Sequence, residues 1–133
     1  TSDQSRINLA DDADAIAQKI KRAKTDPEML PEQIEGLEGR HEAANLVGIY
    51  AALSDKTTSE VLSEFGGKGF GQFKPALADL AVSVLSPITS EMRRLLADPA
   101  EIDLMIADGA TRARTVAEPI LKRTKELVGF LEV

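Results

Sequence analysis

The sequence predicts an all-α fold, a bundle of five or six helices in which the two long C-terminal helices are kinked by proline. Apolar residues recur at intervals of three and four along most of the chain, which is the helical period. No segment alternates apolar and polar residues with the period of two that a strand requires. With 133 residues, 43% hydrophobic and 29% charged, the chain is long enough for one domain with a buried core.

The first predicted helix follows a polar leading segment, residues 1–10, which is expected to be extended. Acidic residues at 11–14 suit a helix N-terminus, both as caps and through the helix dipole. Thr25-Asp26-Pro27 should stop the helix, because a residue before proline is pushed away from helical geometry. The apolar stripe between these signals consists of Ala13, Ile16, Ala17, Ile20 and Ala23.

Residues 27–41 are predicted to form a long loop, with one short turn at 31–34, because prolines and glycines interrupt the segment. Loops of this length in compact domains tend to be functional or mobile. A second helix is expected from about Glu42 to Leu53. Thr57 and Glu60 have the spacing of a capping box, which predicts a third helix ending near Phe65.

A glycine-rich segment follows, Gly66-Gly67-Lys68-Gly69-Phe70-Gly71-Gln72-Phe73-Lys74. Glycine-rich loops that hold nucleotide phosphates follow a hydrophobic strand and open a helix. In this chain a predicted helix precedes the glycines and no Gly-Lys-Ser/Thr follows, so nucleotide binding is disfavoured. The segment is predicted to be a structural joint between helices, with Lys68 and Lys74 free to meet an anion.

Two long helices are expected after the glycines. Pro75 suits the first turn of a helix that runs to about Ala97, which Pro87 should kink or split. Asp98-Pro99 should open the last helix, with a kink at Pro119 and an end at Gly129. Core positions are also predicted at helical spacing, namely Phe65, Met92 and Met105.

The composition excludes several kinds of site. The chain has no cysteine, and its single histidine, His41, gives no cluster for zinc, so no metal site is predicted. His41 lies in a polar run and is expected to be exposed near a helix start, so no catalytic residues are predicted. No apolar run approaches the ~20 residues of a membrane span, and no signal peptide is recognisable. A soluble protein without a membrane partner is therefore expected.

Cations crowd the end of the first predicted helix, at Lys19, Lys21, Arg22 and Lys24. At about 100° per residue, Lys21 and Lys24 should lie on one flank of the apolar stripe, and Lys19 and Arg22 on the other. These cations complement the negative end of the helix dipole, and they are also candidates for a phosphate-binding patch. Because the net charge is −6, any contact with nucleic acid would need such a local basic patch.

Six blocks of sequence, taken in order, resemble one known family. They are Ser5-Arg6-Ile7-Asn8-Leu9, Asp11-Asp12-Ala13, Lys19-Ile20-Lys21-Arg22-Ala23-Lys24-Thr25-Asp26, Asn45-Leu46-Val47-Gly48-Ile49-Tyr50, Gly67-Lys68-Gly69-Phe70-Gly71-Gln72-Phe73-Lys74 and Ser86-Pro87-Ile88. The residues Gly109-Ala110-Thr111-Arg112-Ala113-Arg114 and Val128-Gly129-Phe130 extend the similarity to the end of the chain. Together they look like the C-terminal helical part of bacterial-type tryptophanyl-tRNA synthetases.

The resemblance implies a non-catalytic piece of an enzyme that uses ATP to attach tryptophan to tRNA(Trp). The family's His-Ile-Gly-His-like and Lys-Met-Ser-Lys-Ser motifs do not occur in this chain, and the second is expected shortly before Thr1. ATP with Mg²⁺ is therefore expected to bind outside the chain, which needs no cofactor itself. Residues 1–10 would lead from the catalytic domain, and residues 11–133 would form a domain that binds the anticodon region. A cytoplasmic homodimer without a DNA partner is implied.

The resemblance also suggests tRNA-binding residues. It places Lys24, Thr25 and Asp26 near the anticodon, where threonine or aspartate can bond base edges and lysine can hold phosphates. Two departures from the family lie close by, namely Pro27 in place of an expected serine and a loop from Met29 to Arg40 of different length and content. Further candidate phosphate contacts are Lys19, Lys21 and Arg22, with Lys68 and Lys74 as weaker ones.

Two other interpretations fit parts of the sequence. A stand-alone helical protein-interaction module without a nucleic-acid role is favoured by the net charge of −6 and by the lack of a broad basic face. The equivalent domain of a tyrosyl-tRNA synthetase would also explain the Lys19–Asp26 block. The blocks at Asn45–Tyr50 and Gly67–Lys74 favour the tryptophanyl family over the tyrosyl one.

Overall fold

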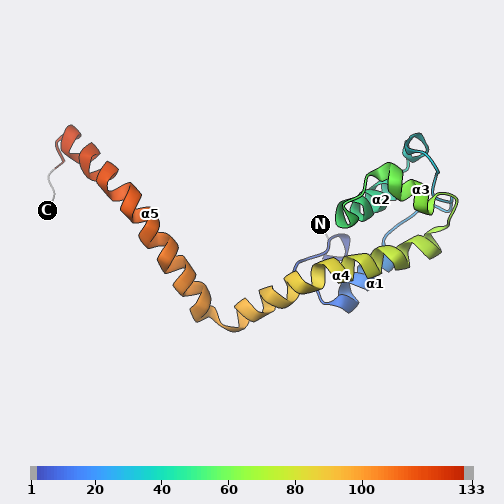
Figure 1. Ribbon diagram of the computed structural model, residues 1–133, viewed down its shortest axis with the longest axis horizontal. Coiled ribbons are helices and arrows are strands. Elements are labelled where there is room, and N and C mark those ends of the chain that lie inside the picture. Colours follow the sequence, from blue (N-terminus) through green and yellow to red (C-terminus); the bar gives the residue numbers. More distant parts are fainter. Residues whose placement is uncertain (1–2, 131–133) are drawn as a thin grey trace. The chain divides into compact units, whose positions relative to one another are not determined.

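A computed structural model describes residues 3–130, and the predicted all-α class is confirmed for this part of the chain (Figure 1). Five α-helices and two short 3-10 helices follow one another, and no strand occurs among these residues. The elements are η1 (Asp3–Ser5), α1 (Ala13–Arg22), η2 (Ile34–Leu37), α2 (His41–Ser54), α3 (Thr58–Phe65), α4 (Phe70–Ala97) and α5 (Pro99–Val128). The leading segment differs from the prediction, because η1 makes part of it helical instead of extended.

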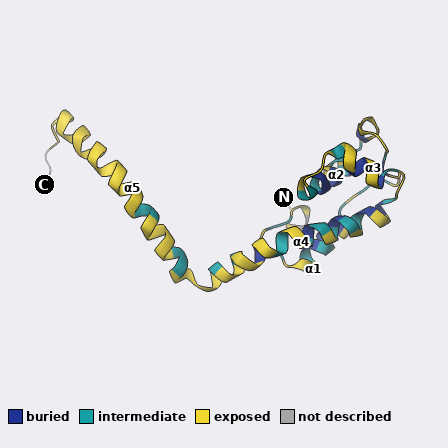
Figure 2. Cartoon of the chain, in the orientation of Figure 1, coloured by how far each residue is buried: buried dark blue, intermediate teal, exposed yellow. Residues whose placement is uncertain are grey.

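The chain forms two compact units, with unit 1 extending to Met92 and unit 2 beginning at Arg93. All residues of the hydrophobic core lie in unit 1 (Figure 2), where α1 to α4 and the loop before α2 contribute to it. Aromatic rings occupy its centre, with Tyr50, Phe65 and Phe73 in mutual contact at centroid distances of 5.0–5.6 Å. Large side chains that are fully buried include Ile16, Leu30, Leu62, Phe73 and Leu77.

Capping signals in the sequence set several helix ends. Asp12 caps α1 by accepting a 2.8 Å hydrogen bond from the Ala15 N–H. Thr57 and Glu60 form the predicted capping box of α3. Helix α1 ends at Arg22, before the predicted stop at residues 25–27, because Ala23 adopts extended backbone angles.

The segment before α2 is an ordered part of unit 1. Leu30 and Leu37 are buried in the core, so the chain from 27 to 40 is anchored at two points. Its helical turn is η2, at residues 34–37, later than the turn predicted at 31–34. His41 is the first residue of α2 and is exposed, as predicted.

The glycine segment is a joint between α3 and α4, as predicted. The Leu30 N–H donates to the Lys68 carbonyl at 3.0 Å, and the Gly67 N–H donates to the Leu30 carbonyl at 2.8 Å. Gly67 has a φ of 73°, which favours glycine. A Cβ on Gly66 would lie 2.6 Å from the Leu62 carbonyl oxygen and 2.9 Å from the Glu32 Cα. The glycines therefore let the loop before α2 pass close to the end of α3.

Helix α4 begins earlier than predicted, at Phe70 instead of near Pro75. The Gly69 carbonyl accepts the N–H groups of Gln72 and Phe73, and Phe73 is fully buried, so tertiary packing extends the helix toward the glycines. Pro75 and Pro87 both lie inside α4, and the helix is not split at Pro87.

In unit 2, helix α5 opens at Asp98-Pro99 and ends with Gly129 in the left-handed conformation, as predicted. The Arg94 guanidinium makes two hydrogen bonds to the Glu101 carboxylate, at 2.6 and 2.9 Å, across the turn at Asp98. No residue described in α5 is buried. The core prediction is therefore confirmed for Phe65 and wrong for Met105, which is 57% exposed, while Met92 is half-buried.

Candidate nucleic-acid interface

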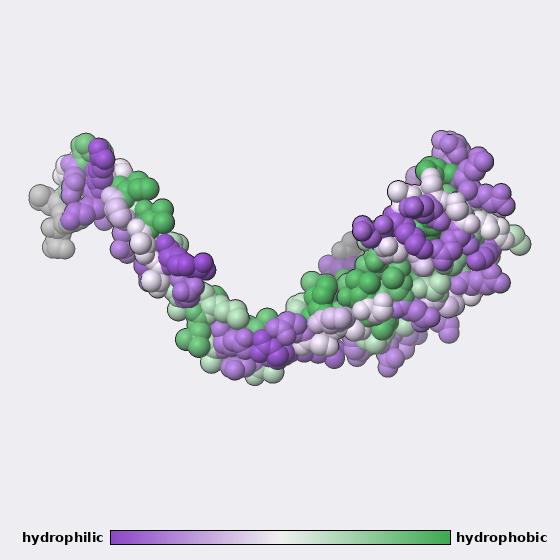
Figure 3. All heavy atoms as spheres, in the orientation of Figure 1, coloured by the Kyte–Doolittle hydropathy of each residue, from purple (hydrophilic) through white to green (hydrophobic). Residues whose placement is uncertain are grey.

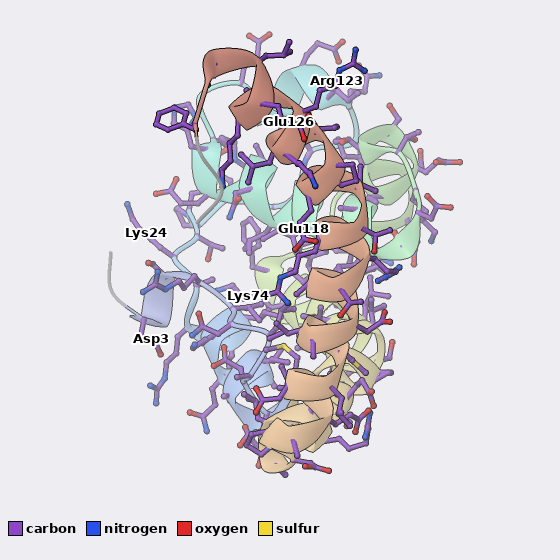
Figure 4. The ribbon with its side chains drawn as sticks, turned by 90° about the vertical axis from the view of Figure 1, so that its left-hand side faces the viewer. Asp3, Lys24, Lys74, Glu118, Arg123 and Glu126 are labelled. Atoms are coloured by element: carbon purple, nitrogen blue, oxygen red, sulfur yellow. The ribbon has the colours of Figure 1, made fainter. Side chains whose placement is uncertain are left out.

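The predicted basic cluster surrounds the C-terminal end of α1, where Figure 4 shows Lys24 and Lys74. Lys74 comes from α4, and its ammonium donates hydrogen bonds to the carbonyl oxygens of Ala23 at 2.6 Å and Lys21 at 3.3 Å. It therefore satisfies carbonyls that the end of α1 leaves unpaired and complements the helix dipole. These bonds use two of the three donors of the ammonium, so a phosphate could accept at most one further bond from it.

Lys19 lies at the inner edge of the cluster and is only 8% exposed. Its ammonium forms ion pairs with Asp11 at 2.7 Å and Asp3 at 3.2 Å, which tie the leading segment to α1. The hydrogen bond between Lys19 and Asp11 lowers the pKa of Asp11 and raises the pKa of Lys19. A phosphate could reach Lys19 only by replacing these carboxylates.

Lys21, Arg22 and Lys24 are the exposed cations of the cluster. Lys24 pairs with Glu42 at 2.8 Å, although its side chain is 85% exposed. Among the described residues, the side chains of Lys21 and Arg22 have no ion-pair partner. The predicted flanks are partly wrong: Lys24 shares a groove with Lys19 and Arg22, because the chain leaves the helical path after Arg22, whereas Lys21 lies in another groove.

The proposed base-reading residues are engaged differently. The carboxylate of Asp26 accepts two hydrogen bonds from the Arg40 guanidinium, at 2.6 and 3.0 Å, and a third from the Glu28 N–H at 3.0 Å. Arg40 holds the pKa of Asp26 below its usual value, and it also donates to the Met29 carbonyl at 2.9 Å. Asp26 therefore organises the loop before α2. Thr25 is half-buried, and no described group bonds its hydroxyl.

Lys68 is exposed in the glycine segment, with its ammonium 5.0 Å from the centroid of the Phe65 ring. This cation–π contact is compatible with contact to an anion, because the ammonium remains open to solvent. The structure therefore brings Lys19, Arg22 and Lys24 to one groove and leaves Lys21 and Lys68 exposed outside it.

A groove of about 610 Å³ lies between the leading segment, the end of α1, the outer face of α2 and Leu85 of α4. Arg6 and Asn45 line it, and residue-by-residue sequence reasoning did not select either one. Asn45 could have been found from the sequence, since Glu42, Asn45, Leu46, Ile49 and Leu53 share one helical face. Arg6 could not, because nothing in the leading segment predicted its approach to α2.

Comparison with known proteins finds relatives that match nearly the whole chain. A tryptophan–tRNA ligase of Agrobacterium fabrum is 62% identical over 130 residues, which are 98% of this chain and 37% of the ligase. The corresponding ligase of Rhizobium meliloti is 61% identical over 131 residues, with the same coverage of both chains. Over nearly its whole length, the chain is therefore similar to part of the tryptophan–tRNA ligases. The resemblance stated from the sequence is thereby confirmed in preference to the tyrosyl alternative.

The match covers only part of these relatives. In the tryptophan–tRNA ligase of Caulobacter vibrioides, 60% identical over 129 residues, the matched stretch is 97% of this chain and 38% of the ligase. The chain thus spans little more than a third of the curated ligases it matches. No protein-family model matches the chain. Within residues 3–130, no helix is long and apolar enough to cross a membrane, and no metal-binding group of histidine and acidic side chains is assembled.

Proposed function

We propose that this chain is the C-terminal, tRNA-binding helical part of a tryptophan–tRNA ligase, and that unit 1 contacts the anticodon region of tRNA(Trp). The observation that carries the proposal is 62% identity to a ligase that acts on this class of RNA, over nearly the whole chain. ATP and Mg²⁺ would bind in the remainder of the intact ligase, which we propose to be a cytoplasmic homodimer.

The electrostatics of unit 1 support this role. The chain carries a net charge of −6, yet exposed cations gather at the end of α1, and among the described residues only Lys24 of these pairs with an acid, Glu42. Lys21 and Arg22 are exposed and have no described ion-pair partner, so a phosphate can approach them without breaking an existing contact. We therefore assign Lys21 and Arg22 as the principal phosphate contacts, with Lys24 and Lys68 as weaker ones. The segments that carry this surface are held together by the ion pairs and hydrogen bonds of Lys19, Lys74 and Asp26.

The test is tRNA binding by the full-length ligase with the double change Lys21→Glu and Arg22→Glu. Losing two phosphate contacts should weaken binding at least about tenfold and lower the slope of log K against log salt by about 1.4–1.8. The measurement is a series of filter-binding titrations with tRNA(Trp) at several salt concentrations.

A matched control separates local contacts from the overall change of charge. Arg114→Glu with Arg123→Glu makes the same change of charge on exposed residues of α5. The control should leave both the affinity and the salt slope near those of the unchanged ligase. Equal losses in the two variants would contradict the assignment to α1, as would unchanged binding after the reversal at Lys21 and Arg22.

A further inference from the structure

We propose that the groove between the leading segment, α1 and α2 takes one unstacked nucleotide of the RNA, with Asn45 bonding the base edge and Arg6 and Arg22 holding its phosphates. The proposal rests on the tRNA-binding function above and adds a subsite to it. It assigns binding roles to Arg6 and Asn45.

The size and lining of the groove suit a nucleoside. Its volume of about 610 Å³ lies within the range of small-molecule sites, about 300–1,000 Å³. Apolar side chains from four parts of the chain line it, including buried Ile20 and Leu46 and half-buried Ile49 and Leu85. Unstacked bases of single-stranded RNA are recognised by stacking on aromatic side chains or on the plane of an arginine guanidinium. The described lining of this groove holds no aromatic ring, so Arg6 or Arg22 would supply the stacking plane and the apolar side chains would exclude water.

The charge of the groove favours a polyanion over an apolar peptide. Its lining includes Arg6, Lys19, Arg22 and Lys24 against a single acid, Glu42. Lys19 and Lys24 form ion pairs with acidic residues of the chain. Arg6 and Arg22 are exposed and have no described partner. Two free guanidinium groups beside an apolar surface match a phosphate–base–phosphate unit. Guanidinium is also the cation whose geometry fits phosphate in a bidentate manner.

Asn45 supplies the group that can distinguish bases. It is exposed on α2, and its side-chain amide has no hydrogen-bond partner among the described residues. An amide offers both donors and an acceptor, which is the combination that pairs with base edges. The other polar side chain that α2 contributes to the groove, Glu42, is paired with Lys24, whereas Leu46 and Ile49 are apolar. Asn45 is therefore the residue through which α2 could read a base.

The test combines Asn45→Ala with an abasic scan of the RNA. The full-length ligase, unchanged and as the variant, is titrated with a stem–loop RNA of the tRNA(Trp) anticodon arm, in which each loop nucleotide is made abasic in turn. For the intact stem–loop, Asn45→Ala should raise Kd about tenfold. At one loop position, the abasic change should also weaken binding by the unchanged ligase about tenfold, yet cause no further loss in the variant. Such non-additivity identifies two groups in direct contact.

Two further variants test the specificity of the Asn45 effect and the role of Arg6. Gln18→Ala removes an exposed amide from α1 outside the groove and should leave Kd unchanged. Arg6→Gln should weaken binding of every RNA about equally and lower the salt slope by about 0.7–0.9, as a phosphate contact requires. Circular dichroism should show Asn45→Ala folded, because alanine favours an exposed helix position.

The outcomes separate the groove from the broader function. Unchanged Kd in Asn45→Ala, or losses that add at every abasic position, would overturn the groove proposal. If the reversal at Lys21 and Arg22 still weakened tRNA binding in that case, the proposed function would stand without the subsite. If the unchanged ligase bound tRNA with no salt dependence, both proposals would fail together.

Discussion

Helices α4 and α5 have similar apolar periodicity in the sequence but different surroundings in the structure. Most of α4 belongs to unit 1, where Phe73, Leu77 and Ala81 are fully buried. No described residue of α5 is buried, and Figure 3 shows hydrophobic residues, in green, at several places along its surface. These apolar residues of α5 include Leu104, Met105, Ile106, Val116, Ile120, Leu121 and Leu127, all more than half exposed.

Apolar periodicity predicts a helix and its apolar face, but not where that face packs. A repeat of three and four residues predicts a helix with one apolar face. It does not say whether the partner of that face lies within the same chain. In unit 1 the partner is present, because the loop before α2 and helices α1 to α3 share one core with α4. No described residue of α5 belongs to a core.

The largest expected contrast comes from removing the same side chain in each unit. Leu77→Ala in α4 should destabilise the chain by about 2–5 kcal/mol, because it opens a cavity in the core. Leu121→Ala in α5, where the side chain is 53% exposed, should change stability by less than about 0.5 kcal/mol. Urea unfolding of the 133-residue chain, with hydrogen exchange to assign the affected unit, measures both. A cost at Leu121 that grows with protein concentration would show that the face is covered by another copy.

Replacing glycine by alanine should have opposite effects on stability in the two units. Gly66→Ala should destabilise unit 1 by about 2–3 kcal/mol, since its Cβ would lie 2.6 Å from the Leu62 carbonyl oxygen. Gly109 lies inside α5, where a Cβ would meet nothing within 4 Å. Gly109→Ala should therefore stabilise α5 by up to about 1 kcal/mol through helix propensity. Thermal melts followed by circular dichroism would test both signs, and a stabilising Gly66→Ala would contradict the close packing.

The predictable parts of the fold are those encoded by neighbours in sequence. The cap at Asp12, the capping box at Thr57 and the C-terminal end at Gly129 all depend on residues within one helical turn. The start of α4 at Phe70 was not predictable in this way, because burial of Phe73 outweighs the signal of Pro75. Long-range packing decided that boundary.

The candidate site was likewise predictable only in part. The sequence showed that basic residues gather at the end of α1. It did not show which of them are free to bind a ligand, because their partners come from distant segments. Lys19 meets Asp3 and Asp11, Lys74 comes from α4, and Asp26 binds Arg40 fourteen residues later in the chain. Sequence spacing predicts a charge, and tertiary structure decides whether that charge is free to bind a ligand.

The pair of Arg40 and Asp26 gives an intermediate effect with a characteristic pH dependence. Arg40→Met should destabilise unit 1 by about 2 kcal/mol at pH 7, because it removes charge-assisted hydrogen bonds from a mostly buried guanidinium. Since Arg40 lowers the pKa of Asp26, the pair stabilises the fold above about pH 4 and loses this effect as pH falls through the lowered pKa.

Urea unfolding between pH 7 and pH 2 would follow this dependence. The difference in stability between the unchanged chain and Arg40→Met should shrink on the acid side. A difference that stayed constant down to pH 2 would contradict the role assigned to the Asp26 carboxylate.

The smallest expected effect lies at the edge of the core of unit 1. Thr89 of α4 is 5% exposed, and its hydroxyl has no hydrogen-bond partner among the described residues. In α5, by contrast, the hydroxyls of Thr111 and Thr115 donate to carbonyls one turn earlier, at 2.9 Å in each case. Thr89→Val keeps the shape and removes the unpaired group, so it should stabilise unit 1 by about 1 kcal/mol. Thr111→Val, the matched change at an exposed position, should stay within about 0.5 kcal/mol of the unchanged chain. A destabilising Thr89→Val would mean that the hydroxyl has a partner in solution, and the polar boundary of the core would then extend to Thr89.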